Sequence, residues 1–255
     1  MQVRVLGASG GETRSEPMTC FLLNDSVAFD AGSLTRSLDI DEQVSLRAVV
    51  VSHAHLDHVR DLATIADTRA QRNAKPLRVF ATAATIRALR THLFNGAVWP
   101  DFTAIPSEKR PAIRFVEVRP GERFRVEGMT LRAIPVHHAI QTVGLIASDS
   151  GGAVVLSGDT GPTDALWEEA RRVGRRLRAV LVECSFPRRM EWLARISWHL
   201  SPDSLASQLL KLGPRPSGLT VALYHFKPGF AAEIEAEVRE LADGVVLART
   251  GMIVR

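Results

Sequence analysis

The chain has 255 residues, of which 45% are hydrophobic and 24% charged, and its formal net charge is +4. These values are typical of a soluble globular protein. No apolar run approaches the roughly 20 residues that cross a bilayer, and the start MQVRVLGASGG lacks the regions of a secretion signal. The expectation is therefore a cytoplasmic protein without a membrane span. The two cysteines, Cys20 and Cys184, are too few for a disulfide framework and lack a paired metal-binding spacing, so any bound metal would use nitrogen and oxygen ligands.

Short apolar runs alternate with helical patterns along the chain. The apolar runs predict strands at Val3–Leu6, Cys20–Leu23, Val27–Asp30, Ala48–Ser52, Arg78–Ala81, Ile113–Val118, Met129–Pro135, Val143–Ser148, Ala153–Ser157, Ala179–Glu183, Leu219–Tyr224 and Val245–Ala248. The helical patterns predict helices at Val59–Gln71, Ala83–Leu93, Thr163–Val173, Pro202–Leu212 and Ala231–Leu241. The stretch from Phe94 to Pro111, rich in proline and polar residues, predicts a long loop. No linker divides the chain, so the order of elements predicts one domain, residues 1–255, in which two sheets pack together with helices outside.

The run RRVGRRLR, residues 171–178, is the densest basic cluster of the chain. Basic clusters can bind the phosphates of nucleic acids. However, the 28 arginines are spread through every segment, and in this run Glu168 and Arg172 can pair at i, i+4 on a helix. We therefore interpret the run as a solvated helix face, and nucleic acid remains an alternative partner that is not favoured.

The stretch VVVSHAHLDHVRDL, residues 49–62, places three of the eight histidines and one aspartate at the end of a predicted strand. Side chains two residues apart on an extended backbone share a face, so His53 and His55 point the same way, and Asp57 and His58 follow closely. Imidazoles beside a carboxylate favour a divalent cation. The alternative is a set of surface histidines with Asp57 as a helix cap, which leaves the clustering to coincidence.

Three further strand ends carry candidate ligands. IPVHHAI brings His137 and His138, of which only one can face the cluster because adjacent side chains of a strand point to opposite faces. VVLSGDTG brings Asp159 in a glycine-flanked turn, and VALYHFKPG brings His225. Polar residues on loops at strand ends often form active sites. Since one metal takes three or four ligands in such sites, this number of candidates predicts two metals.

These motifs resemble the metallo-β-lactamase superfamily along almost the whole chain. HAHLDH is similar to the HxHxDH signature, with LGASGG and FDAGS before it and PVHHAIQTVGL, SGDTG and LYHFKP after it. The resemblance implies an α/β fold, a four-layer αββα sandwich with two metals at one edge of the sheets. It also implies the ligands: His53, His55 and His138 for one metal, Asp57, His58 and His225 for the other, and Asp159 bridging both. In similar sequences the liganding histidine lies six residues before a glycine, here Gly144, which selects His138 over His137.

Within the superfamily the chain resembles the class II cyclic-nucleotide phosphodiesterases, with tRNase Z as a relative. SHAHLDHVRDLATIAD, the pair VECSFP and WHLSPDSLASQLLKL, and the ending HFKP are similar to the class II forms. The chain departs from them at Asp61, where a glycine is often present, and at Trp198, which replaces the usual glycine. Only 24 positions lead from Asp159 to Glu183, too few for the arm with which many tRNase Z enzymes grip tRNA. Asp159 also argues against lactam cleavage, because those enzymes commonly carry cysteine there.

The resemblance and the charge of the predicted site favour hydrolysis of a small cyclic nucleotide, 3′,5′-cAMP or a relative, to the 5′-monophosphate by attack of a metal-bridging hydroxide. Two dications, two aspartates and a hydroxide leave a net charge of about +1, which suits a singly charged phosphodiester. The predicted catalytic residues are Asp57, His199 and Glu183; His199 protonates the leaving alkoxide, and Glu183 orients His199 or raises its pKa. Lys227 either contacts the phosphate or is an exposed lysine, and Asp30 is expected to support a metal-binding histidine from behind.

Several alternatives remain open at this point. His199 could be only a helix-start residue beside a Ser201 cap, whereas His92 is expected to be an ordinary surface or packed histidine. The competing functions are a tRNase Z-like RNA 3′-end endonuclease, a thioester or other ester hydrolase on the same metals, and a non-catalytic metal-stabilised module. Zinc is the expected metal, with manganese or iron as alternatives. The expected partner is a small phosphodiester and not a membrane, and the oligomeric state stays open, a homodimer included.

Overall fold

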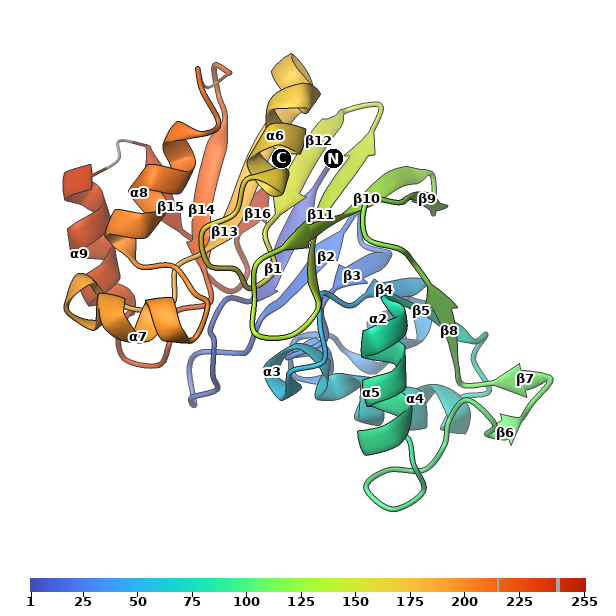
Figure 1. The fold of residues 1–255 in the computed structure, drawn as a ribbon. Coiled ribbons are helices and arrows are strands. Elements are labelled where there is room, and N and C mark those ends of the chain that lie inside the picture. The colour runs from blue at the N-terminus through green and yellow to red at the C-terminus, as the bar shows by residue number, and fades with distance from the viewer. Residues whose placement is uncertain (215, 242–243) are drawn as a thin grey trace.

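The computed structural model of the protein describes residues 1–214, 216–241 and 244–255. In this part of the chain two seven-stranded sheets face each other, and helices lie on their outer faces (Figure 1). Each sheet has one half with antiparallel and one half with parallel neighbours, so the two sheets have similar topologies.

The first sheet contains strands from the N-terminal half of the chain and one strand from the C-terminus. Its strands, in spatial order, are β16 (Ile253–Val254), β1 (Val3–Gly7), β2 (Cys20–Leu23), β3 (Val27–Phe29), β4 (Ala48–Val50), β5 (Leu77–Ala81) and β8 (Ile113–Glu117). The strands of the second sheet, in spatial order, are β15 (Val245–Leu247), β14 (Thr220–Tyr224), β13 (Leu177–Glu183), β12 (Gly152–Leu156), β11 (Thr142–Asp149), β10 (Met129–Val136) and β9 (Arg123–Val126). A separate hairpin pairs β6 (Pro106–Ser107) with β7 (Arg110–Pro111).

The helices fall into two groups by position in the chain. The first group contains α1 (Leu34–Ser37), α2 (Ile40–Ser45), α3 (Leu56–Val59), α4 (Asp61–Gln71) and α5 (Ala83–His92). The second contains α6 (Ala165–Val173), α7 (Glu191–Ile196), α8 (Pro202–Leu210) and α9 (Ala231–Leu241), and short 3-10 turns cover Gly174–Arg176 and Arg188–Met190. In the described residues no helix is long and apolar enough to cross a membrane.

Three buried apolar clusters separate four layers. One lies between the two sheets, where Phe21 and Tyr224 meet edge to face with ring centroids 4.9 Å apart. A second joins the first sheet to helices of the first group, and a third, which includes Trp167, joins the second sheet to α6, α8 and α9. Successive side chains of each strand point to opposite faces of its sheet, so each sheet packs on the other sheet with one face and on helices with the other. The layers are therefore α, β, β, α, and the predicted fold class is confirmed.

The structure corrects two of the predicted elements. The stretch from Phe94 to Pro111 is not loop throughout, because it contains the β6–β7 hairpin. The predicted helix Val59–Gln71 is two helices, since the amide of Asp61 donates to the carbonyl of Ala31 at 2.9 Å instead of continuing the α3 ladder. The strands β9 and β16 and the short helices α1, α2 and α7 were not predicted from the sequence, because short elements carry a weak periodic signal.

Candidate metal centre and active site

Strand ends of both sheets deliver polar side chains to one place. The motif with His53 and His55 follows β4, His138 follows β10, Asp159 follows β12 and His225 follows β14. The seven predicted ligands converge in groups whose ligand atoms lie within 4.8 Å of one another: His53, His55, His138 and Asp159 in one group, and Asp57, His58 and His225 in another. The structure therefore brings together every side chain that the sequence predicts for the metal site, and their ligand roles remain a prediction.

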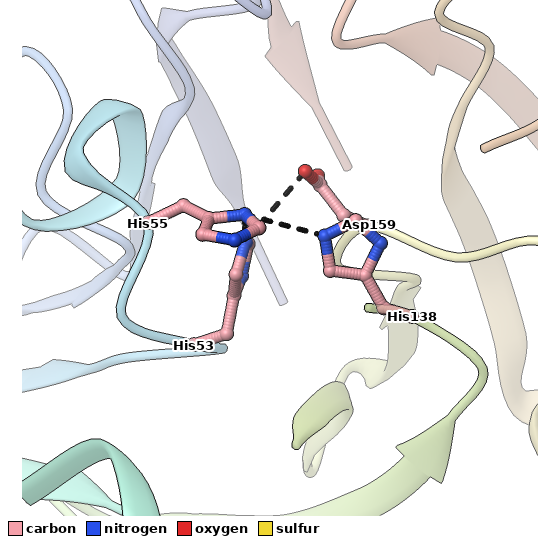
Figure 2. A group of neighbouring side chains, drawn as sticks. All are labelled: His53, His55, His138 and Asp159. Atoms are coloured by element: carbon pink, nitrogen blue, oxygen red, sulfur yellow. Dashed lines mark hydrogen bonds and ion pairs between the residues drawn. The ribbon is translucent and has the colours of Figure 1, made fainter. Parts of the chain in front are cut away.

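The first group joins three imidazoles and a carboxylate (Figure 2). The Nε2 atom of His53 lies 2.9 Å from Nδ1 of His55, which in turn lies 3.3 Å from Nε2 of His138. The Oδ2 atom of Asp159 lies 3.7 Å from Nε2 of His53. Four donor atoms from three separate segments thus surround one point.

The second group shares Asp159 with the first. Its Oδ2 atom lies 3.2 Å from Nε2 of both His58 and His225. The two imidazole Nε2 atoms are 3.3 Å apart, and Oδ2 of Asp57 lies 3.2 Å from Nε2 of His225. Asp159 consequently lies within reach of histidines from both groups, and its bridging role remains a prediction.

Two polar residues hold the outward nitrogens of the first motif. The Nδ1 atom of His58 donates to Oδ2 of Asp30 at 2.7 Å, as a carboxylate can only accept. Ser52 donates its hydroxyl to the same carboxylate at 2.9 Å, so it can accept from Nδ1 of His53, which is 2.9 Å away. Asp30 therefore contacts a predicted ligand from behind, as the sequence suggests, and Ser52 is a supporting residue that the sequence did not reveal.

The outward nitrogens of His138 and His225 also have hydrogen-bond partners. The Nδ1 atom of His138 donates to the backbone carbonyl of Trp198 at 3.1 Å, and Nδ1 of His225 faces the hydroxyl of Ser185 at 2.9 Å. With the proton on each outward nitrogen, the inward nitrogen of the ring carries a lone pair. Several lone pairs then point at one another across 3.3 Å or less, which is unfavourable unless a cation lies between them.

The donor set fits divalent cations in a further respect. The Oδ1 atom of Asp159 is buried and has no hydrogen-bond partner among the described residues, although a buried carboxylate oxygen normally has one. Burial lowers the pKa of His53, His55, His138 and His225. These imidazoles are therefore neutral at physiological pH, which is the form that binds metal. Imidazoles with carboxylates suit zinc, manganese or iron.

Two members of the second group titrate differently. Burial lowers the pKa of His58, but the carboxylates of Asp159 and Asp30 outweigh burial and raise it overall. Burial raises the pKa of Asp57, yet its hydrogen bond to His225 and the nearby His58 bring it below the usual range.

A second polar network adjoins the cluster at the end of β13. Glu183 is fully buried; its Oε1 accepts from Nδ1 of His199 at 2.7 Å and from the amide of Thr160 at 2.9 Å. Its Oε2 accepts from the hydroxyl of Ser185 at 2.8 Å. Burial lowers the pKa of His199, but the charge and hydrogen bond of Glu183 outweigh burial and raise it. The predicted pair is thus in contact, and Ser185 links it to His225.

The backbone is strained where the site is built. Asp30, Trp198 and His225 have φ angles of 61°, 58° and 65°, in the left-handed region; aspartate and histidine adopt it more readily than most residues, whereas the bulky tryptophan rarely does. A Cβ added to Gly10 would lie 2.8 Å from the ring of His225, so only glycine allows this ring its position. Such strain persists where the surrounding structure determines the geometry, as in binding sites.

The remaining candidates have simpler surroundings. The ring of His137 packs against Trp198 with centroids 4.1 Å apart, whereas that of His138 faces the cluster. Lys227 donates to the carbonyl of Gly10 at 3.0 Å. His92 is exposed at the end of α5. Asp61, which stands where a glycine is often present in similar sequences, is buried and accepts from the amide and hydroxyl of Thr35 at 2.8 Å each.

A cluster of histidines and aspartates at the strand ends of a four-layer αββα sandwich is the arrangement of a metallo-β-lactamase-fold protein. The family model described as "Beta-lactamase superfamily domain" matches residues 22–226. The chain belongs to this superfamily.

Two curated relatives and one solved structure illustrate the similarity. A "Probable 3′,5′-cyclic-nucleotide phosphodiesterase" of Yersinia pestis is 28% identical in an alignment 277 positions long, gaps included, which covers 90% of this chain and 79% of the relative. A "Ribonuclease Z" of Mycobacterium sp. (strain KMS) is 29% identical over 214 residues, covering 77% of this chain and 71% of the relative. The crystal structure of unliganded yeast PDE1 superposes with a TM-score of 0.83 over 99% of this chain and 98% of that chain; its identity of 21% supports a shared fold only.

Proposed function

We propose that the protein is a metal-dependent phosphodiesterase that hydrolyses a small cyclic nucleotide, 3′,5′-cAMP or a relative, to the 5′-monophosphate. Relatives named as cyclic-nucleotide phosphodiesterase and as ribonuclease Z both act on phosphodiesters, which supports the reaction class. The observation that carries the proposal is the position of the His199–Glu183 pair beside the histidine and aspartate cluster. A purely structural metal site has no need of such a pair.

In this proposal the side chains of the cluster bind the cations, and the loaded site binds and positions the phosphodiester. Divalent cations held by the seven predicted ligands would supply Lewis-acid chemistry, which activates water and neutralises phosphate charge. Asp57 and Asp159 contribute two negative charges and the five imidazoles none, so a cation-loaded site keeps a positive excess that attracts a phosphodiester anion.

His199 is the group that can supply a proton to the leaving oxygen. Its Nδ1 proton is held by Glu183 at 2.7 Å, so its Nε2 atom is free to act on a substrate. Its ring centroid lies 5.0 Å from that of His138 and 5.2 Å from that of His225, so it borders both groups of ligands. Its raised pKa, due to the Glu183 carboxylate, favours the protonated form that a general acid needs.

The test combines a substrate panel with a pair of variants. Zinc-, manganese- and iron-loaded protein is assayed on cyclic nucleotides, linear phosphodiesters, a thioester and a pre-tRNA. We expect cyclic-nucleotide hydrolysis, and we expect His199→Ala to keep the bound-metal stoichiometry while kcat falls by about 100-fold or more. His92→Ala, at an exposed histidine on α5, is the matched control and should keep full activity. Hydrolysis by His199→Ala at the unaltered rate would remove His199 from the reaction, and no cyclic-nucleotide turnover with any metal would overturn the proposed function.

The second candidate is an RNA 3′-end endonuclease, which the similarity to the mycobacterial ribonuclease Z favours. In this chain the segment from Asp159 to Glu183 is taken up by α6, a 3-10 turn and β13. This segment therefore offers no long projection for holding tRNA. Cleavage of the pre-tRNA without hydrolysis of any cyclic nucleotide would select the second candidate.

A further inference from the structure

A groove remote from the metal centre crosses the outer face of the second sheet. It has a volume of about 300 Å³ and lies between α6 and the strands β9, β10 and β11. Four arginines from separate elements line it: Arg123 of β9, Arg132 of β10, Arg172 of α6 and Arg176 of the following 3-10 turn. Arg172 and Arg176 belong to the basic run of residues 171–178, which the sequence suggests is a solvated helix face. In the structure these two arginines lie across a groove from Arg123 of β9 and Arg132 of β10, so this face is one wall of a concave site.

The strand register explains why the groove is polar. Arg123 lies opposite Arg132, and Thr130 lies opposite Ser148, so these side chains project from one face of the sheet. On this face α6 packs against β10, and its buried side chains share an apolar cluster with Ile134 of that strand. Towards the β9 edge the helix no longer covers the sheet, and the exposed positions there are arginines and hydroxyls.

The positive charge of the groove is only partly neutralised within the protein. Among the described residues that line it, Glu169 is the only carboxylate, and both Arg132 and Arg172 donate to it. The four guanidinium groups and this one carboxylate leave a net charge of +3 in the groove. Glu169 also holds two of the guanidinium groups in place.

The carboxylates next to the groove have other partners. Asp149 contacts the N-terminal amine at 3.2 Å and accepts from Asn24 at 2.9 Å, and Glu127 accepts from Arg78 at 2.6 Å. Within the described residues Arg123 and Arg176 make no ion pair, although Arg176 donates to the backbone carbonyl of Asp149. Their charges are therefore available to a ligand.

We propose that this groove is a second binding site, for a small anion that carries two or more phosphate groups. Guanidinium forks match phosphate oxygens in pairs, and several of them in one groove favour a multiply charged ligand over a single phosphate. The hydroxyl of Thr130 can donate to the same oxygens, whereas that of Ser148 already donates to the carbonyl of Thr130 at 3.1 Å; Ile146 provides an apolar floor. A volume of about 300 Å³ is at the lower end for small-molecule sites, which suits a di- or triphosphate better than a nucleic-acid strand.

The groove is separate from the proposed active site. Arg132 lies in β10 four residues before the strand ends at Val136, which corresponds to about 13 Å of extended chain. The chain then continues to His138 at the metal cluster. Binding in the groove therefore does not depend on the proposed function, and either can fail without the other.

Calorimetry on the zinc-loaded protein tests the proposal, with tripolyphosphate and ATP as separate probes. We expect saturable binding of one tripolyphosphate that weakens as salt is raised, and at least about a tenfold loss of affinity in the double variant Arg123→Ala/Arg176→Ala. The matched control, Arg171→Ala/Arg175→Ala, removes the same charge from exposed arginines of the same segment that do not line the groove. The control should bind like the unmodified protein.

The outcomes separate a built site from general electrostatics. Equal losses in both double variants, unchanged binding in Arg123→Ala/Arg176→Ala, or no saturable binding would overturn the proposal. Tighter binding of a single-stranded RNA than of either probe, with several proteins per strand, would also overturn it in favour of a nucleic-acid surface. Equal affinity for tripolyphosphate and ATP would show that the phosphates alone are recognised, whereas tighter binding of ATP would add a contact from the nucleoside.

Discussion

Replacement of Asp30 by asparagine tests how the structure supports a predicted metal ligand. Asp30 is fully buried and accepts three hydrogen bonds: from the amide of Ser52 at 2.7 Å, from its hydroxyl at 2.9 Å, and from Nδ1 of His58 at 2.7 Å. An asparagine has one acceptor oxygen and one donor group. If the oxygen stays with the amide of Ser52, the new NH₂ group faces the Nδ1 proton of His58. The His58 ring can accept a hydrogen bond from this NH₂ group only if its proton moves from Nδ1 to Nε2. Nε2 then no longer has the lone pair that would bind the metal.

The size of the effect follows from these contacts. Loss of a supporting hydrogen bond behind a metal-binding histidine typically costs about 10- to 100-fold in metal affinity. A buried donor left unpaired costs about 1–3 kcal/mol of folding stability. We therefore expect Asp30→Asn to bind zinc about 10- to 100-fold more weakly, and to unfold at lower urea concentration both with zinc and with a chelator.

The matched control is Asp61→Asn, which makes the same change at another buried aspartate. Asp61 accepts from Thr35 and from Arg60, and its carboxylate makes no hydrogen bond to a predicted ligand. This variant should lose stability but keep its zinc affinity, measured by competition with a chromophoric chelator. Unaltered zinc affinity in Asp30→Asn, or an equal loss in Asp61→Asn, would refute the proposed link between the Asp30 hydrogen bond and metal binding by His58.

Three further predictions concern the same site. Ser185→Ala removes the hydroxyl that lies 2.9 Å from Nδ1 of His225, so zinc affinity should fall by about tenfold, and a chelator titration that shows no change would contradict this role. Trp198→Gly should be more stable than Trp198→Ala by about 1 kcal/mol in urea unfolding, because only glycine adopts the φ of 58° without cost; equal stabilities would count against strain at this residue. Gly10→Ala should lower the zinc content, because its Cβ would lie 2.8 Å from the ring of His225, whereas Gly11→Ala meets only a proline side chain at 3.0 Å; equal zinc contents would show that the ring can move aside.

The predicted ligands in the sequence were found from local properties. His53 and His55 follow a buried strand, and side chains with a period of two share a face, so their common direction is contained in the sequence itself. Asp159 and His225 follow apolar strands too, three residues after the end of β12 and one residue after the end of β14. The choice of His138 over His137 came from the family resemblance; in the structure His138 faces the cluster and His137 packs on Trp198, and the ligand role of His138 stays a prediction.

The supporting contacts depend on tertiary structure. Ser52, Ser185 and the carbonyl of Trp198 hold imidazoles from behind, yet a serine at a strand end or a backbone oxygen has no distinctive pattern in a sequence. The arginine groove is a similar case, since the run of residues 171–178 is visible in the sequence but its partners from β9 and β10 are not.

Residue type and spacing are local, so the sequence by itself determined which side chains are candidates for metal binding and that they follow the ends of apolar strands. The convergence of segments that are distant in the chain, such as His58 and His225 at 3.3 Å, was decided only by the tertiary structure. The physical reason is that strand pairing and the burial of apolar faces between the layers place the strand ends side by side, and these are interactions between elements that no single segment contains.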